Sequence, residues 1–251
     1  MAITKLGKEI LENSGKQNKK KSIGESLGVY FKSLLPMAGM GVGQTLLSAP
    51  LMVPMVRNSH NNLTAEESKK LVDLMAKGKD ITIEDTGTKW INRIRSHARP
   101  DLNYVYAPKD SYVLAHELGH ATGPLANKYS RIPASIAYRL GNNAMGLRFL
   151  ESAQKAYNRA KGYAEEDDSK VLSGLSTASK FGTGYQLAEE GQATIRGLNA
   201  IKKLQGFGGV GKAVKSLLPA YGTYLLNAGV AHGIAPRLGE MYGKYLARDD
   251  K

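Results

Sequence analysis

Two stretches without a charged residue lie on either side of a middle region in which apolar and polar residues alternate regularly. Leu34–Val56 lies between Lys32 and Arg57, and Ser216–Pro236 lies near the C-terminus. Each is long enough to reach across a hydrocarbon core of about 30 Å. Prolines and polar side chains interrupt both stretches, which an isolated spanning helix accommodates poorly. Each stretch therefore fits either a membrane-associated segment or a part of the core, and the first fits a buried hairpin.

Between these stretches, the spacing of apolar positions predicts short strands and helices. Thr64-Ala65-Glu66-Glu67 is a capping box that opens a helix ending near Lys77. Alternating apolar residues predict strands at Ile81–Glu84 and Asn103–Tyr106. A second helix is expected around Trp90, Ile91 and Ile94, closed before Pro100. We interpret this segment, with its short strands and helices, as a compact α+β unit.

A further helix is expected from the cap at Asp110 or Ser111 to Ala121, because Gly123-Pro124 terminates it. Helical patterns continue over Ser135–Lys161 and Leu187–Leu204. The acidic run Glu165–Asp168 is either a solvated turn or a calcium site. The glycine-rich stretch Gln205–Gly211 fails the P-loop spacing and is expected to be a linker.

These patterns predict an α+β fold, mostly helical, with a small sheet and apolar helical flanks. Four segments are expected along the chain. They are a basic polar segment (1–26), an apolar glycine- and proline-rich segment (27–57), a core (58–204), and a glycine-rich linker with an apolar basic helical segment (205–251).

Charge and composition narrow the classes of protein. The chain has no cysteine, which excludes disulfides and thiolate metal ligands. The net charge of +13 is concentrated at the two ends, as in segments that contact anionic lipid or nucleic acid. No nucleic-acid-binding motif accompanies that charge, which disfavours a DNA-binding protein. The N-terminus lacks the pattern of a secretory signal, so a membrane-associated or cytoplasmic location is expected. The sequence does not indicate an oligomeric state.

The segment His116-Glu117-Leu118-Gly119-His120 carries the most specific chemistry. On a helix, residues four apart share a face, so His116 and His120 can bind one metal ion. Glu117 lies on the adjacent edge, where it can accept a proton from a water that Zn²⁺ activates for attack on a peptide carbonyl. The strand Asn103–Tyr106 lies just upstream and is expected to be an edge strand that pairs with an extended peptide substrate.

A catalytic zinc site needs a third protein ligand. The pattern that supplies a third histidine is absent, because Ala126 occupies its position. Glu190 is the better candidate, since Ala193 and Gly197 beside it would let its helix approach the zinc helix closely. Glu189 is the alternative ligand. The remaining histidines have no motif around them: His60, His97 and His232.

Together, His116-Glu117-Leu118-Gly119-His120-Ala121 and Glu190-x-x-Ala193-Thr194-x-x-Gly197 resemble the gluzincin metallopeptidases. The similarity is to the membrane-associated neutral zinc metallopeptidases of bacteria and to the CAAX-processing and heat-shock membrane proteases. It covers about residues 80–200 and implies a zincin-like (minigluzincin) core with His116, His120 and Glu190 as zinc ligands and Glu117 as base. Where many members carry Asp, this chain has Thr194, a weaker group for orienting a ligand histidine.

The resemblance leaves the oxyanion-stabilising residue open among Tyr185, Arg196 and His232. The sequence thus favours a zinc-dependent metallopeptidase acting on a peptide or protein. The alternative is a structural or membrane-penetrating protein, for example a phage internal virion protein, that retains a zincin-like metal-binding core. The basic ends and the glycine-rich apolar stretches fit that alternative.

Overall fold

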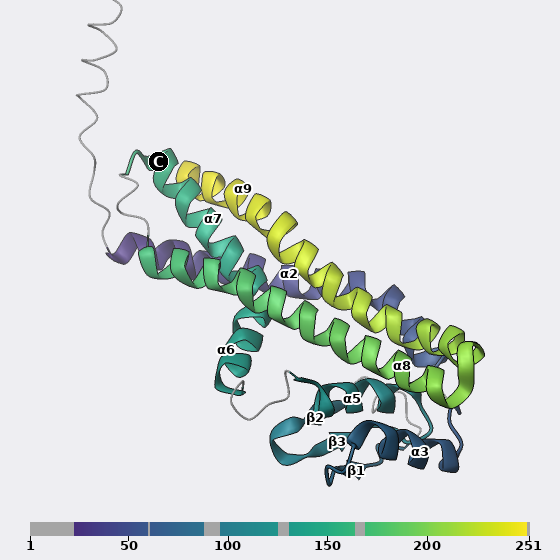
Figure 1. Ribbon diagram of the computed structural model, residues 1–251. Coiled ribbons are helices and arrows are strands. Elements are labelled where there is room, and N and C mark those ends of the chain that lie inside the picture. Colours follow the sequence, from purple (N-terminus) through teal and green to yellow (C-terminus); the bar gives the residue numbers. More distant parts are fainter. Residues whose placement is uncertain (1–22, 60, 88–95, 125–130, 164–168, 250–251) are drawn as a thin grey trace, which may run out of the picture. The chain divides into compact units, whose positions relative to one another are not determined.

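The computed structural model describes residues 23–59, 61–87, 96–124, 131–163 and 169–249 (Figure 1). Most of them are helical, and a small sheet makes the fold α+β. The helices are α2 (Ile23–Arg57), α3 (Ala65–Ala76), α5 (Tyr112–Thr122), α6 (Arg131–Asn142), α7 (Ala144–Lys161), α8 (Lys170–Gly229) and α9 (Ala235–Asp249). The strands are β1 (Thr82–Glu84), β2 (His97–Arg99) and β3 (Tyr104–Tyr106). A 3₁₀ turn, η1 (Pro100–Leu102), and a π-helical turn, η5 (Val230–Ile234), complete the element order.

The chain forms two compact units, and each is assembled from separate segments of the sequence. The first unit comprises Met1–Gly41, Ala144–Ala178 and Val230–Lys251. The second comprises Val42–Asn143 and Ser179–Gly229. Both units are discontinuous along the chain, unlike the four consecutive segments expected from the sequence. The residues Trp90–Ile94 of an expected helix and the acidic run Glu165–Asp168 lie outside the described residues, as does most of the basic segment 1–26. The expectation that this helix closes just before Pro100 is wrong, because His97–Arg99 forms β2.

The sheet of the second unit has the strand order β1-β3-β2. β1 pairs with β3 in parallel, with Ile83 opposite Val105, and β2 pairs with β3 antiparallel, with Ala98 opposite Val105. The strands expected at Ile81–Glu84 and Asn103–Tyr106 are confirmed. The expectation that Asn103–Tyr106 is an edge strand is wrong, because β2, which the sequence pattern did not indicate, occupies its other side.

The two helices with sequence caps form as expected. Thr64 accepts a hydrogen bond from the Glu67 amide, and the Glu67 carboxylate accepts one from the Thr64 amide, which completes the capping box of α3. Lys77 ends α3 in the left-handed conformation. Ser111 caps α5 by accepting from the Val113 amide, and α5 ends at Gly123.

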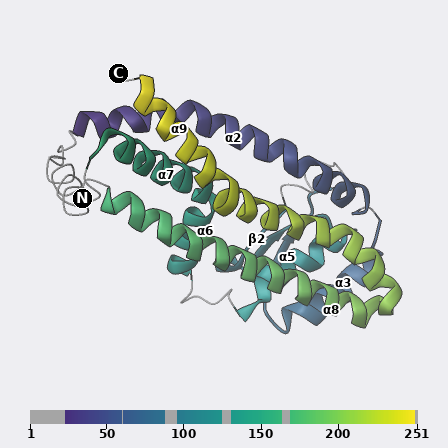
Figure 2. The same cartoon turned by 90° about the horizontal axis from the view of Figure 1, so that it is seen from above.

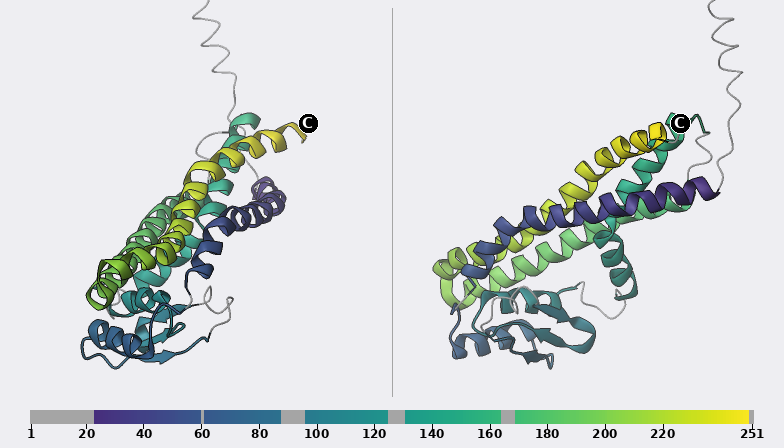
Figure 3. Two further views of the ribbon diagram at one scale, coloured as in Figure 1. Left: turned by 90° about the vertical axis from the view of Figure 1, so that its right-hand side faces the viewer. Right: turned by 180° about the vertical axis from the view of Figure 1, so that it is seen from behind.

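The helix α8 turns back on itself, as Figure 3 shows, and Gly206 is the residue within it that leaves the helical conformation. Gly206 has φ +70° and ψ −164°, a conformation that favours glycine, and the residues on both sides are helical. The two arms then run back along each other, so that a Cβ on Gly191 would lie 3.5 Å from the Tyr221 ring. The prediction of a linker over Gln205–Gly211 is therefore wrong, because within this segment only Gly206 has a non-helical conformation.

The core of the second unit joins the sheet to three helices. Its fully buried side chains come from α3, β3, α5 and both arms of α8: Leu71, Val105, Leu114, Leu118, Ile201 and Leu217. Figure 1 shows α5 between the sheet and α8 in this unit. Because apolar side chains anchor α5 on both sides, the helix that carries the histidine pair is held in a fixed orientation.

Two other expectations about helices require correction. Leu34–Val56 is not a hairpin, because α2 continues as one helix through three prolines. The pattern at Ser135–Lys161 is divided into α6 and α7 at Asn143, whose amide and side chain both hydrogen-bond to the Arg139 carbonyl.

In the first unit, α7 and α9 pack side by side (Figure 2). A Cβ on Gly239 would lie 2.3 Å from the Phe149 carbonyl oxygen, and one on Gly243 would lie 2.1 Å from that of Ala153. Glycines four residues apart on α9 thus allow the two backbones to meet. Phe149 and Ala153 are buried in this contact.

Candidate metal centre

The helix α5 places His116 and His120 on one face, one turn apart. His116 is buried and the side chain of His120 is 11% exposed. Their rings meet edge to face with centroids 4.6 Å apart. Two imidazoles are thus brought together in a largely buried place, where polar groups need partners.

The second half of the site comes from the first arm of α8, which approaches α5 with no side chain between the backbones. A Cβ on Gly119 would lie 2.5 Å from the Ala193 carbonyl oxygen. A Cβ on Gly197 would lie 3.1 Å from the Ala115 carbonyl oxygen. The expectation that Ala193 and Gly197 permit a close approach is confirmed, and this approach brings Glu190 to the histidines.

Three ligand atoms converge at the contact between these helices. The Nε2 atoms of His116 and His120 are 3.0 Å apart, and Glu190 Oε2 lies 3.2 Å from the first and 3.4 Å from the second. Two bonds of about 2.05 Å at a tetrahedral angle place their ligand atoms about 3.3 Å apart, so one Zn²⁺ fits this triangle. Both imidazole nitrogen and carboxylate oxygen are ordinary zinc ligands, which makes the donor set chemically suitable.

The outward nitrogens of both rings also have partners. His120 Nδ1 lies 2.6 Å from Glu189 Oε1, and His116 Nδ1 lies 3.2 Å from Thr194 Oγ1. If each Nδ1 carries the proton and donates it outward, both Nε2 atoms present lone pairs to Glu190. Three acceptors then face one another, and a cation between them would relieve their repulsion.

The charges of the cluster are strongly coupled. Burial alone would raise the pKa of Glu190, but when His116 and His120 are protonated, their hydrogen bonds to Glu190 outweigh burial and lower that pKa to about 2. Burial would lower the pKa of His120, and its hydrogen bonds to Glu189 and Glu190 instead raise it well above the ordinary value. The site therefore has a marked preference for positive charge next to Glu190.

Glu117 lies beside this cluster and has a different environment. Its side chain is buried, and burial raises the pKa of its carboxyl group, with a further rise from the charge of Glu190. His116, His120 and the more distant His97 oppose that rise. Glu117 makes no hydrogen bond to another described residue. A carboxylate with a raised pKa is suited to accept a proton near neutral pH.

The structure brings together His116, His120 and Glu190, with Glu117 adjacent, as the sequence motifs suggested. The three residues considered for the oxyanion differ in position. Tyr185 packs its ring against Tyr138, Arg196 donates hydrogen bonds to Thr122, and His232 belongs to the first unit. None of them is linked to the cluster by a described contact.

Two tyrosines at the site were missed by sequence reasoning. The Tyr138 hydroxyl, on α6, donates to Glu189 and lies 3.4 Å from Glu190 Oε1. Tyr224, on the second arm of α8, has its pKa raised by burial and by its interactions with Glu190, Glu117 and Glu189. No local pattern marks either residue, because one reaches the site through the packing of α6 and the other through the reversal of α8.

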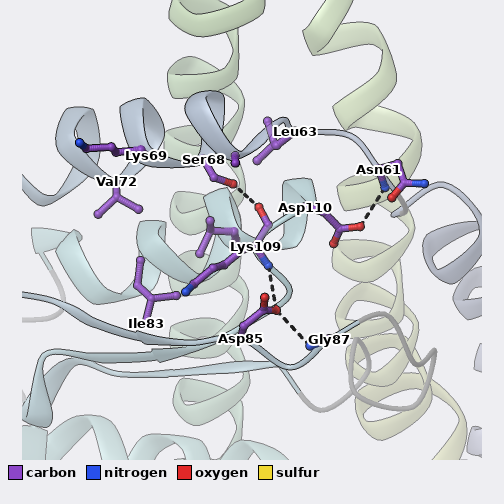
Figure 4. A pocket seen from close by; sticks show the side chains of 12 residues that line it. Asn61, Leu63, Ser68, Lys69, Val72, Ile83, Asp85, Gly87, Lys109 and Asp110 are labelled. Atoms are coloured by element: carbon purple, nitrogen blue, oxygen red, sulfur yellow. Dashed lines mark hydrogen bonds between the residues drawn. The ribbon is translucent and has the colours of Figure 1, made fainter.

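A separate cavity of about 580 Å³ lies in the second unit between α3, β1 and the residues that precede α5 (Figure 4). Leu63, Val72 and Ile83 line it, and Asp85 at its rim accepts hydrogen bonds from the Gly87 and Lys109 amides. None of the three metal-ligand candidates lines this cavity. Its chemistry is that of a partly apolar surface hollow.

Comparisons of this chain with protein-family models, with curated proteins and with solved structures find no match. The functional assignment of the site therefore depends on its own geometry.

Proposed function

We propose that this protein is a zinc-dependent metallopeptidase of the gluzincin type, with His116, His120 and Glu190 as zinc ligands and Glu117 as general base. The observation that carries the proposal is the triangle of Nε2, Nε2 and Oε2 atoms with sides of 3.0–3.4 Å. Two imidazoles and one carboxylate form the ligand set of many catalytic zinc sites and leave a coordination position open. The second unit would then be a peptidase unit with a zincin-like fold.

Zinc bound by these residues would supply Lewis acidity and lower the pKa of a bound water to about 7. Glu117 accepts the proton from the attacking water and delivers it to the leaving amine nitrogen. Its burial and raised pKa support this role. Tyr224 keeps its hydroxyl proton, because its pKa is raised, and interacts electrostatically with both Glu117 and Glu190. We assign it, in place of Tyr185, Arg196 or His232, as the donor to the carbonyl oxygen that becomes negative during attack.

The substrate in this proposal is an extended peptide that pairs with β2 rather than with β3. β2 contacts α5, and its residue His97 influences the charge of Glu117. Within the described part of the sheet, β2 has a neighbour on one side only. An edge strand next to the catalytic helix can bind a peptide backbone through main-chain hydrogen bonds.

The proposal also includes association with a membrane. Among the described helices, α2 over Gly24–Arg57 is the one that is long and apolar enough to cross a membrane, and its most apolar window is 11% buried. The second charge-free stretch, Ser216–Pro236, is divided between α8, η5 and α9 and does not meet the same criterion. The basic flanking residues Lys32 and Arg57 favour anionic headgroups.

The same exposed helix favours one alternative, a membrane-penetrating protein in which the metal site has only a structural role. The two functions differ in their dependence on Glu117. A peptidase requires this residue as a base, whereas a structural zinc site requires only His116, His120 and Glu190.

The test is zinc analysis of the purified full chain together with a chelator-sensitive peptidase assay. We expect about one zinc per chain, because the site has three protein ligands and one open position. Glu117→Gln should retain zinc and lose at least about a hundredfold in cleavage rate, the typical effect of losing a general base. Wild-type protein that cannot take up zinc would exclude the peptidase. Zinc without cleavage would favour the structural alternative.

A further inference from the structure

A closed ring of polar contacts surrounds His120. One of its nitrogens, Nδ1, faces Glu189 Oε1 at 2.6 Å, and the other, Nε2, faces Glu190 Oε2 at 3.4 Å. The Tyr138 hydroxyl completes the ring, since it donates to Glu189 Oε2 and lies 3.4 Å from Glu190 Oε1. Tyr138 therefore contacts the oxygen of each glutamate that does not face the histidine.

The helix α6, which carries Tyr138, packs so closely against α8 that no side chain fits between the two backbones at Gly182. A Cβ on Gly182 would lie 2.5 Å from the Ala137 carbonyl oxygen and 2.7 Å from the Gly141 amide nitrogen. Gln186 donates to the Tyr138 carbonyl oxygen at 3.3 Å and to the Asn142 side chain at 2.7 Å. Because the backbone on both sides of the hydroxyl is held, the position of the hydroxyl is determined by packing.

The two ligand histidines are supported unequally. Thr194 offers His116 a neutral hydroxyl at 3.2 Å, whereas Glu189 offers His120 a carboxylate at 2.6 Å. Hydrogen bonds to charged acceptors are roughly twice as strong as those between neutral groups. A carboxylate behind a ligand histidine fixes the tautomer and makes the ring a stronger metal ligand.

From this arrangement we propose that Tyr138 and Glu189 are positioning residues for the metal centre. Glu189 supplies, behind His120, the orienting carboxylate that Thr194 does not supply behind His116. Tyr138 donates its one hydroxyl proton to Glu189 Oε2, which fixes that carboxylate behind His120, and its oxygen lies 3.4 Å from Glu190 Oε1. The inference rests on the proposed metal site, but not on peptidase activity.

The experiment measures metal binding by the full chain carrying Tyr138→Phe, Glu189→Gln or both changes. Zinc affinity is obtained by competition with a chromogenic chelator, and coordination geometry from the visible absorption of the Co²⁺-loaded protein. Each single variant should bind zinc about 10- to 100-fold more weakly, the usual effect of removing an outer-shell partner. The double variant should lose less than the product of the two single losses, because both changes break the same hydrogen bond.

Tyr185→Phe is the matched control. Its ring contacts that of Tyr138 with centroids 6.1 Å apart, yet no described contact links its hydroxyl to the glutamates. It should keep the zinc affinity and the Co²⁺ spectrum of the wild type. Tyr138→Phe should change the Co²⁺ spectrum, because Glu189 loses the hydrogen bond that fixes it behind His120 and the orientation of the His120 ring then changes.

A folded Tyr138→Phe variant with wild-type zinc affinity and Co²⁺ spectrum would overturn the proposal. If that variant does not fold, Glu189→Gln decides in the same way. If the wild-type chain binds zinc but cleaves no peptide, the peptidase proposal is wrong, and the metal-binding test of Tyr138 and Glu189 can still be carried out. A wild-type chain that binds neither metal would overturn both proposals.

Discussion

A Cβ atom on Gly119 would lie 2.5 Å from the carbonyl oxygen of Ala193 and 2.8 Å from its Cα atom. The contact is between backbones, so no side-chain rotation can relieve it. Gly119→Ala should therefore separate α5 from α8, with a cost of about 1–3 kcal/mol in stability. The same displacement moves Glu190 away from the two histidines, so zinc affinity should fall as well. Thermal unfolding and chelator competition measure the two effects.

Gly184→Ala is the control for this variant. Gly184 lies on the same helix α8, is exposed, and has open space where a Cβ would be added. An alanine is favoured over glycine in a helix by roughly 0.5–1 kcal/mol, so this change should be neutral or slightly stabilising. Equal loss of zinc affinity in both variants would show that the close contact at Gly119 does not control the site.

The ligand assignment predicts that removing a ligand and removing His97 have different effects on the metal content. His120→Ala and Glu190→Ala should each lose zinc on dialysis, because each removes one of three protein ligands. His97→Ala should retain about one zinc per chain, since His97 affects the charge of Glu117 but is not part of the triangle. Metal analysis of dialysed protein measures this. Retention of zinc by Glu190→Ala would show that another residue is the third ligand.

In the first unit, Glu151 predicts a dependence of stability on pH. Its side chain is 9% exposed and accepts hydrogen bonds from Arg148, Lys155, Ser173 and Ser176. Burial alone would raise its pKa, but the bonds from Lys155, Ser176 and Ser173 outweigh burial and lower the pKa below the ordinary value of 4.5. A lowered folded-state pKa stabilises the protein above pH 4.5, and this contribution disappears as the pH falls through the folded-state pKa.

Glu151→Gln should therefore destabilise the protein at pH 7 by about 1–3 kcal/mol, the scale for losing a charged hydrogen-bond partner in a buried place. The difference from wild type should shrink as the pH is lowered below 4.5, and denaturant unfolding at several pH values measures it. Glu240→Gln removes the exposed pair with Lys244 in the same unit and should have little effect. A difference for Glu151→Gln that is independent of pH would point to packing instead of charge.

The sequence predicted the elements whose signals are local. Thr64 and Glu67 form a capping box within four residues, and His116 and His120 share a helix face by spacing alone. Glu190 could be chosen because Ala193 and Gly197 mark a helix surface that tolerates a close neighbour. In each case, residues close in the chain carry the whole signal.

Features that depend on distant segments were not predictable in this way. Glu189 was considered only as an alternative ligand, and its contact with His120 depends on how α8 is oriented. Tyr138 and Tyr224 reach the site from other segments and have no sequence signal of their own. The strand β2 has the sequence His97-Ala98-Arg99, without the β-branched and aromatic residues that mark β1 and β3, which is why β3 was expected at the edge.

Two serine hydroxyls of α2 are paired within the helix, as a membrane helix requires of its polar groups. The buried Ser33 hydroxyl donates to the Val29 carbonyl, and that of Ser48 donates to the Thr45 carbonyl. At the C-terminal end of α2 the Asn58 side chain donates to the Pro54 carbonyl. In lipid, unpaired polar groups cost several kcal/mol each, so this pairing favours insertion. The most exposed apolar side chains of the helix are Phe31, Leu35, Val42, Leu46 and Val53.

We expect the full chain to float with liposomes that contain anionic lipid and to float less as salt is raised, because Lys32 and Arg57 contribute electrostatic attraction. Leu46→Lys should reduce flotation strongly, since Leu46 is 69% exposed near the middle of the charge-free stretch of α2 and a charge near the bilayer centre costs about 2.5–3.5 kcal/mol. Phe181→Lys alters a side chain of similar exposure, 77%, on α8 and should leave flotation unchanged. Failure of the wild-type chain to float at low salt would exclude membrane association through α2.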